Sequence, residues 1–110
     1  MSRPLRGRIF YRRFWLNRPG FHSTAFVLSQ VELRADGEGL DLIASYELAD
    51  CRRSAALDFD VYSNSSAAER RNALRKARRL RKSVNAFCDA LEAAAEEQKR
   101  ASKKRPKKAA

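Results

Sequence analysis

The stretch "TAFVLSQVELRADGEGLDLIASYEL" (residues 24–48) decides the fold class, because it holds two alternating patterns around a turn. In its first half Val27, Val31 and Leu33 alternate with polar residues, which is the period of a strand with one buried face. The pattern predicts a strand over about 24–34. The sequence "ADGEG" that follows predicts a hairpin connection, since Gly and Asp suit tight turns.

The chain beyond this turn repeats the strand pattern twice, in "LDLIASYEL" (40–48) and "AALDFDVYS" (55–63). We therefore expect three antiparallel strands, over about 24–34, 40–49 and 54–62, in a meander with one apolar face. The outer face should carry the acids Glu32, Asp41, Glu47, Asp58 and Asp60. The residues assigned to the apolar face are Val27, Val31, Leu33, Leu40, Leu42, Ala44, Tyr46, Leu48, Leu57, Phe59 and Val61.

A long helix is predicted over about 66–101. Ser66, followed three residues later by Glu69, fits a capping box at its start. Apolar residues then recur at spacings of three and four, which is a helical stripe that we expect to lie on the apolar face of the sheet. Within the stripe Cys88 is interpreted as a small buried apolar residue. The stripe consists of Leu74, Ala77, Leu80, Val84, Phe87, Cys88, Leu91 and Ala95.

The two ends of the chain are basic. Residues 1–20 form either a basic aromatic arm or an additional strand, and "RIFYRRFWL" (8–16) would place aromatic residues on both faces of such a strand. The tail 102–110 contains Lys, Arg and Pro without a large apolar residue, which predicts disorder. The predicted fold is α+β, with 21–101 as a single domain. It consists of a three- or four-stranded antiparallel β-meander packed against one long C-terminal α-helix.

The net charge of +11 is unevenly distributed along the 110 residues. Residues 1–20 hold six Arg and no acid, whereas residues 21–62 hold three Arg and eight acids. Residues 63–110 hold fifteen basic residues and five acids. An acidic middle between two basic segments indicates binding to a partner more than general solubility.

Five basic residues of the predicted helix point to one side. At about 100° per residue they fall opposite the apolar stripe, so we call them the basic band. Like charges at a spacing of four destabilise a helix by a few tenths of a kcal/mol per pair, so helix formation alone does not favour them. Such a band is suited to polyanionic phosphate or to an acidic protein surface. The basic band is Arg71, Arg75, Arg78, Arg79 and Lys82.

Two further basic groups are candidates for contacts with nucleic acid. Arg12 and Arg13 lie among aromatic residues, an arrangement that can hold single strands by stacking. The favoured interpretation of these aromatics is nevertheless that they fill the core, because a domain of this size needs large side chains there. The tail "KKRPKK" (103–108) is similar to a short nuclear localisation signal and could equally be a nonspecific clamp. Its assigned contact residues are Lys103, Lys104 and Arg105.

The outer sheet face also offers a candidate protein interface. Phe26, Leu28 and Ile43 interrupt its polar pattern and predict an apolar patch for a partner or for a homodimer. Alternatively, the N-terminal segment of the same chain folds over these three residues and covers them.

Several classes of function lack support in the sequence. One His and two Cys show no spacing of a zinc site, and the paired Asp58 and Asp60 have no nucleophile or phosphate-binding loop beside them. We therefore expect no enzyme, no metal, no cofactor and no small-molecule substrate. The absence of a long apolar run predicts no membrane span, and Arg12 and Arg13 interrupt the apolar stretch that a secretory signal would need. We expect a cytoplasmic protein, nucleoid-associated if bacterial or phage, or nuclear if eukaryotic.

Three antiparallel strands followed by a helix, over residues 24–95, resemble the topology of plant ethylene-response DNA-binding domains and of phage integrase arm-binding domains. Those domains read the major groove with the sheet, but here the sheet is acidic and the helix basic, so that binding mode is not transferred. Double-stranded-RNA-binding domains are similar in having basic residues at the start of the last helix. The resemblance concerns topology alone.

The function predicted from these features is non-enzymatic nucleic-acid binding through the phosphate backbone. The pattern fits DNA and RNA, and single and double strands, equally. One alternative is a small phage- or mobile-element-type adaptor or inhibitor that binds a nucleic-acid-handling protein complex. A third interpretation is a ribosome-associated RNA-binding protein.

Overall fold

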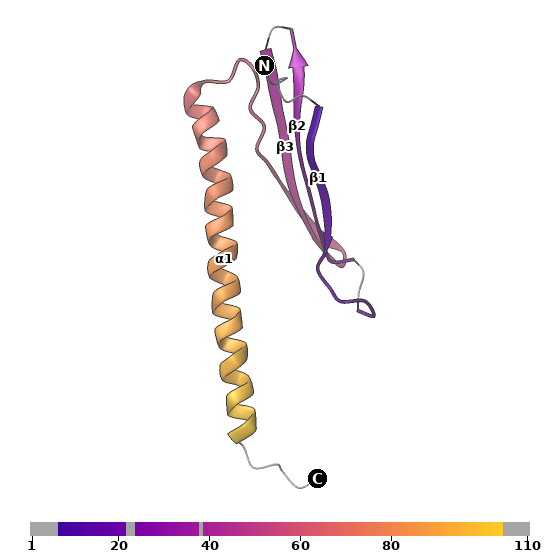
Figure 1. The fold of residues 1–110 in the computed structure, drawn as a ribbon, viewed down its shortest axis with the longest axis vertical. Helices are drawn as coiled ribbons and strands as arrows, with labels where there is room; N and C mark the ends of the chain where they lie inside the picture. The colour runs from indigo at the N-terminus through magenta and orange to yellow at the C-terminus, as the bar shows by residue number, and fades with distance from the viewer. Residues whose placement is uncertain (1–6, 22–23, 38, 105–110) are drawn as a thin grey trace, which may run out of the picture. The chain divides into compact units, whose positions relative to one another are not determined.

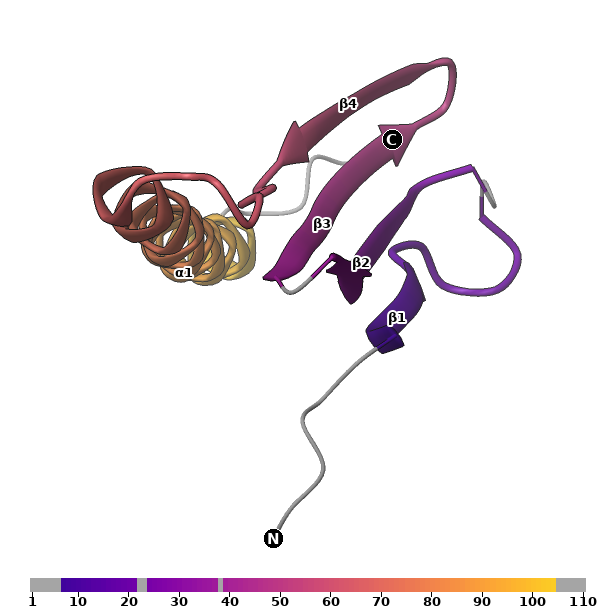
Figure 2. The same ribbon diagram turned by 90° about the horizontal axis from the view of Figure 1, so that it is seen from above.

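The computed structural model describes residues 7–21, 24–37 and 39–104 and has the predicted α+β fold. A four-stranded antiparallel sheet precedes one long helix (Figure 1). Its strands follow one another across the sheet in chain order (Figure 2). The chain forms two compact units, Met1–Arg75 and Lys76–Ala110. The elements are β1 (Gly7–Trp15), β2 (Phe26–Asp36), β3 (Gly39–Asp50), β4 (Arg53–Asp58) and α1 (Ala67–Lys104).

The N-terminal segment is a strand, which decides between the two structures considered for residues 8–16. β1 pairs with β2 over its whole length, from Gly7 opposite Leu33 to Trp15 opposite Phe26. The pairing shifts by one residue between Arg8 and Phe10, so Ile9 is the extra residue of a β-bulge.

Tight turns join the other strands. Asp36 pairs with Gly39, so the β2–β3 connection is two residues long, and Gly37 within it has a φ of 60°. The β3–β4 connection is equally short and places Cys51 at a φ of 55°. A positive φ at the first central residue is the conformation for which hairpins normally use glycine. Cys51 is therefore a strained turn residue.

The register confirms the two faces that the alternation predicts for β2 and β3. Val27 lies opposite Leu48, Val31 opposite Ala44, and Leu33 opposite Leu42, so all are on one side. Burial in the sheet is shallow on both faces. Among the described residues no large side chain is fully buried, and the buried apolar residues are small: Ala25, Val27, Ala44, Ala49 and Val61.

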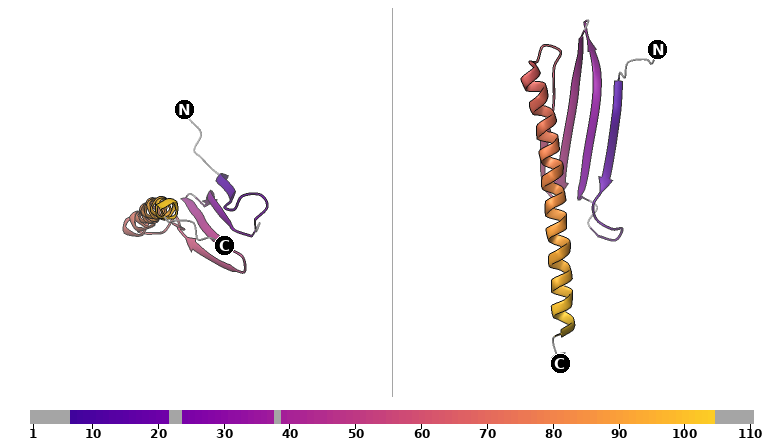
Figure 3. Two further views of the ribbon diagram at one scale, coloured as in Figure 1. Left: turned by 90° about the horizontal axis from the view of Figure 1, so that it is seen from below. Right: turned by 60° about the vertical axis from the view of Figure 1, so that its left-hand side comes forward.

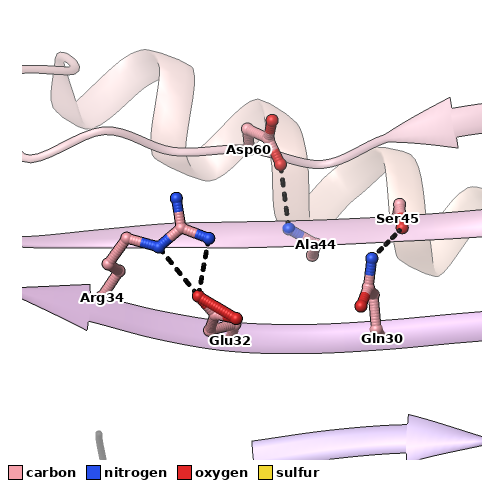
Figure 4. Close-up of polar contacts among 6 residues, drawn as sticks. All are labelled: Gln30, Glu32, Arg34, Ala44, Ser45 and Asp60. Carbon is pink, nitrogen blue, oxygen red and sulfur yellow. Dashed lines mark hydrogen bonds and ion pairs between the residues drawn. The ribbon is translucent and has the colours of Figure 1, made fainter. Parts of the chain in front are cut away.

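The third predicted strand extends past the end of β4. Leu42 and Val61 exchange backbone hydrogen bonds of 2.7 and 2.8 Å, and Phe59 N–H donates to Ala44 at 2.9 Å. Asp60 was expected to be a solvated acid of the outer face, but its Oδ1 accepts a 2.9 Å hydrogen bond from Ala44 N–H (Figure 4). Its side chain turns towards β3 because Ala44, which is buried, needs an acceptor there.

The segment after β4 crosses the start of β3 at close range. A Cβ added at Gly39 would lie 2.6 Å from the Cβ of Ser63, so only glycine fits without displacement. Ser63 N–H donates to Asp41 Oδ1 at 2.7 Å, and its hydroxyl donates to Asp36 Oδ2 at 3.3 Å. These bonds hold the segment that leads to α1.

The predicted capping box is present at the start of α1. Ser66 N–H donates to Glu69 Oε1, and Glu69 N–H donates to Ser66 Oγ, each at 3.1 Å. The hydrogen bond from Ser66 N–H is the main reason that the pKa of Glu69 lies below its ordinary value. The helix begins where the sequence predicts because this chemistry is local.

The C-terminal end of α1 lies beyond its predicted position. The helix continues past Ala101 to Lys104, so the first three residues of the predicted disordered tail 102–110 are helical. The residues in 102–104 are compatible with a helix, and Lys near the last carbonyls favours it. The remainder of the tail lies outside the described residues.

The apolar stripe of α1 is largely exposed. The exposed fraction is 65% for Phe87 and 55% for Leu91. Cys88, which was expected to be buried, is an exposed free thiol, because it belongs to the same uncovered side of the helix. Within the described part of the chain, no helix is both long enough and apolar enough to cross a membrane.

Candidate nucleic-acid interface

The five residues of the basic band lie on one continuous helix (Figure 3). All of them are exposed. Arg71 and Lys82 are eleven residues apart, so the basic band extends over about 17 Å of helix axis. Duplex DNA carries on the order of ten phosphate charges over that length. The basic band therefore places five exposed positive charges along a length over which a duplex carries about ten phosphates.

The basic band has no carboxylate partner among the described residues. Arg34 forms an ion pair with Glu32, 2.8 Å apart, and Arg100 forms one with Glu97, 3.1 Å apart. Neither involves the basic band. An uncompensated cluster of guanidinium groups raises the local positive potential and attracts anions.

Arg12 and Arg13 of β1 lie on opposite faces of the sheet. Arg12 pairs opposite Ser29, and its guanidinium lies over the ring of Phe10 at 5.7 Å and that of Phe14 at 5.4 Å. Arg13 pairs opposite Leu28 and lies over the rings of its neighbours Trp15 and Phe26. The two residues therefore belong to different surfaces.

The face that carries Arg13 has a cluster of arginine and aromatic side chains that simple alternation does not find. Alternation assigns Arg8 to the other face, but the bulge at Ile9 shifts it by one position. Its guanidinium lies 4.5 Å from the ring centroid of Tyr11. The β1 cluster, as we call it, consists of Arg8, Tyr11, Arg13, Trp15 and Phe26.

The β1 cluster is accessible to solvent at its edge. Trp15 is 59% exposed and Tyr11 is 48% exposed. Trp15 and Phe26 make an edge-to-face contact with ring centroids 5.8 Å apart. Half-exposed aromatic rings beside guanidinium groups can stack on nucleobases.

The remaining predicted contact residues lie at the C-terminal end. Lys103 is exposed in the last turn of α1, and Lys104 is its final residue. Arg105 lies outside the described residues.

The predicted apolar patch of the outer face is divided. Phe26, Leu28 and Ile43 share one face, and each is half-buried. Between Leu28 and Ile43 lies the polar pair Gln30 and Ser45, whose side chains are joined by a 3.3 Å hydrogen bond (Figure 4). The two most exposed large apolar side chains, Phe21 at 70% and Phe87 at 65%, lie outside this patch.

The described residues contain no group of three or more His, Cys, Asp and Glu side chains that could hold a metal ion. His22 lies outside them. Cys51 and Cys88 are free and exposed.

Comparisons of the chain with protein-family models, curated proteins and solved structures find no match.

Proposed function

We propose that this protein binds nucleic acid without catalysing a reaction, and that the basic band of α1 contacts the phosphate backbone. The observation that carries the proposal is a row of exposed guanidinium groups without carboxylate partners among the described residues. Arginine binds phosphate oxygens in a bidentate manner, and each neutralised phosphate releases counterions.

The acidic residues of the sheet support the choice of α1, and not of the sheet, as the element that contacts phosphate. Glu32, Glu47 and Asp41 share the outer face, and only Glu32 has a cationic partner in a described ion pair. A phosphate backbone laid across them would meet like charge. The helix is therefore the favoured binding element, in contrast to the sheet-reading domains that the topology resembles.

The β1 cluster lies at the β1 edge of this same outer face, with Arg8 opposite Glu32, and supplies a second contact that uses bases of single-stranded segments instead of the phosphate backbone. Tyr11 and Trp15 offer exposed rings, while Arg8 and Arg13 add positive charge beside them. Stacking on an aromatic ring contributes about 1–3 kcal/mol per base and tolerates any sequence.

The test is a titration of the full chain against labelled duplex DNA, single-stranded DNA and hairpin RNA over a range of salt concentrations. We expect binding at low salt whose affinity falls steeply as salt rises. Absence of binding to all three ligands at low salt would overturn the proposal. Preference for duplex over single strands would remove the stacking role of the β1 cluster.

The exposed apolar side chains of β1 and α1 favour a second candidate, an adaptor or inhibitor that binds a nucleic-acid-handling protein complex. A stoichiometric complex that survives high salt would identify it, because phosphate-driven binding does not persist there. The ribosome-associated interpretation predicts instead that hairpin RNA binds best. For each of these functions we propose a cytoplasmic protein, associated with nucleic acid.

A further inference from the structure

One side of α1 carries apolar residues at alternating spacings of three and four. This spacing averages 3.5 residues, the repeat of a coiled coil, in which such positions form the contact between helices. The series continues without a polar interruption for two and a half heptads. We call this series the seam: Ala77, Leu80, Val84, Phe87, Leu91 and Ala94.

Three of the four larger side chains of the seam are exposed, and the fourth, Leu80, is half-buried. The exposed fraction is 42% for Val84, 65% for Phe87 and 55% for Leu91. Helices gain most of their stability by packing an apolar face, and the repulsion within the basic band weakens α1 further. A long amphipathic helix with an uncovered apolar side is therefore suited to a helical partner.

The charges of α1 indicate what that partner is. Residues 70–82 hold eight Arg and Lys and no acid, whereas residues 83–98 hold four acids and no basic residue. Two copies of α1 side by side in parallel would bring the two basic halves together. In an antiparallel pair the basic half of each copy lies beside the acidic half of the other, which favours that orientation electrostatically.

The seam is also self-complementary in the antiparallel direction. When Val84 lies beside Phe87 of a second copy, Leu80 lies beside Leu91 and Ala77 beside Ala94. Every seam residue then meets an apolar residue, and the small and large pairs are symmetric about the centre. This is the arrangement that a two-fold symmetric interface requires.

We propose that two copies of this chain associate through α1 as an antiparallel coiled coil along the seam. The basic band lies on the opposite side of the helix, about 170° away, so pairing leaves it open to solvent. The dimer presents two basic bands, one towards each end of the helix pair. The proposal stands independently of nucleic-acid binding, because its tests use the protein alone.

The first test measures the mass of the full chain in solution by sedimentation over a concentration series. We expect twice the chain mass for the unmodified protein and a monomer for Phe87→Glu, because a carboxylate at the centre of the seam cannot be buried without a partner. Phe87 is mostly exposed within one chain, so the substitution leaves the fold intact. Asn85→Glu is the matched control, with the same charge on the outer side of α1, and it should remain a dimer.

The second test measures orientation. A spin label is attached at Asn72→Cys in a chain in which Cys51 and Cys88 are replaced by Ser. In the antiparallel pair, position 72 of one copy lies 27 residues along the helix axis from position 72 of the other. This corresponds to about 40 Å along the helix axis. A parallel pair would bring the labels to within about 20 Å, twice the distance between packed helix axes. A monomeric unmodified chain, a dimer of Phe87→Glu or the short label distance would each overturn the proposal.

Discussion

The sheet and the helix treat their charged and polar groups differently. In the sheet Arg34 pairs with Glu32, Gln30 with Ser45, and the Asp60 carboxylate with the Ala44 N–H (Figure 4). In α1 the basic band has no such partner among the described residues, and its like charges repel each other. These polar groups of the sheet therefore contribute to its own stability, whereas the helix presents its charges to solvent, where we propose that they meet nucleic acid.

This difference separates the effects of substitution in the two regions. Changes to the paired polar groups of the sheet, outside the β1 cluster, should alter the free energy of unfolding and leave nucleic-acid affinity unchanged. Changes to the basic band should do the reverse.

The largest effect on stability is expected for Asp60→Ala. The substitution removes the acceptor of the Ala44 N–H, and leaving this buried donor without a partner costs about 1–3 kcal/mol. Urea unfolding followed by circular dichroism measures the loss. Asp60→Asn keeps an acceptor oxygen at the same place and should lose clearly less. Equal losses of stability in Asp60→Ala and Asp60→Asn would show that the hydrogen bond to Ala44 N–H does not contribute to stability.

A smaller effect of opposite sign is expected for Cys51→Gly. Cys51 has a φ of 55°, a conformation that costs a residue with a Cβ roughly 1–2 kcal/mol. Cys51→Gly removes this cost, but the greater freedom of glycine in the unfolded chain offsets part of the gain in stability. We therefore expect a net stabilisation of about 0.5–1 kcal/mol. Cys51→Ala retains the Cβ and serves as the control in the same unfolding experiment. A gain of the same size for alanine would mean that the turn is not strained.

The smallest effect concerns the start of α1. The hydrogen bonds with Ser66 lower the pKa of Glu69 in the folded protein, so this contribution to stability is complete above the pKa of the unfolded chain. It is lost as the pH falls through the lowered folded pKa. NMR titration of the Glu69 carboxyl group should show the lowered pKa. Glu69→Gln should remove this part of the pH dependence, and an ordinary pKa for Glu69 would show that the capping box is not formed in solution.

Local patterns were sufficient to predict much of this fold. Alternation located the faces of β2 and β3, and the capping box located the start of α1, because each depends on residues close together in the chain. The bulge at Ile9 could not be predicted, since it arises from pairing with β2. The inward turn of Asp60 depends likewise on an N–H sixteen residues away.

The candidate site was predictable to a similar degree. The direction of the basic band follows from helical geometry, and the structure shows its residues exposed on α1. The β1 cluster required the register of β1, which places Arg8 with Tyr11 and separates Arg12 from Arg13. Exposure of the stripe, including Cys88, could not be inferred from periodicity, because an amphipathic pattern does not say what covers it.

The most direct measurement compares two triple variants with the same loss of charge. One replaces Arg71, Arg75 and Arg79 by Ala, and the other replaces the exposed Arg34, Arg52 and Arg53 by Ala. Affinity for the best ligand is measured over a salt series. We predict that the helix variant lowers the slope of log affinity against log salt by about two to three, while the sheet variant leaves it near that of the unmodified protein. Equal slopes in the two variants would contradict the account, because binding would then follow net charge and not the basic band.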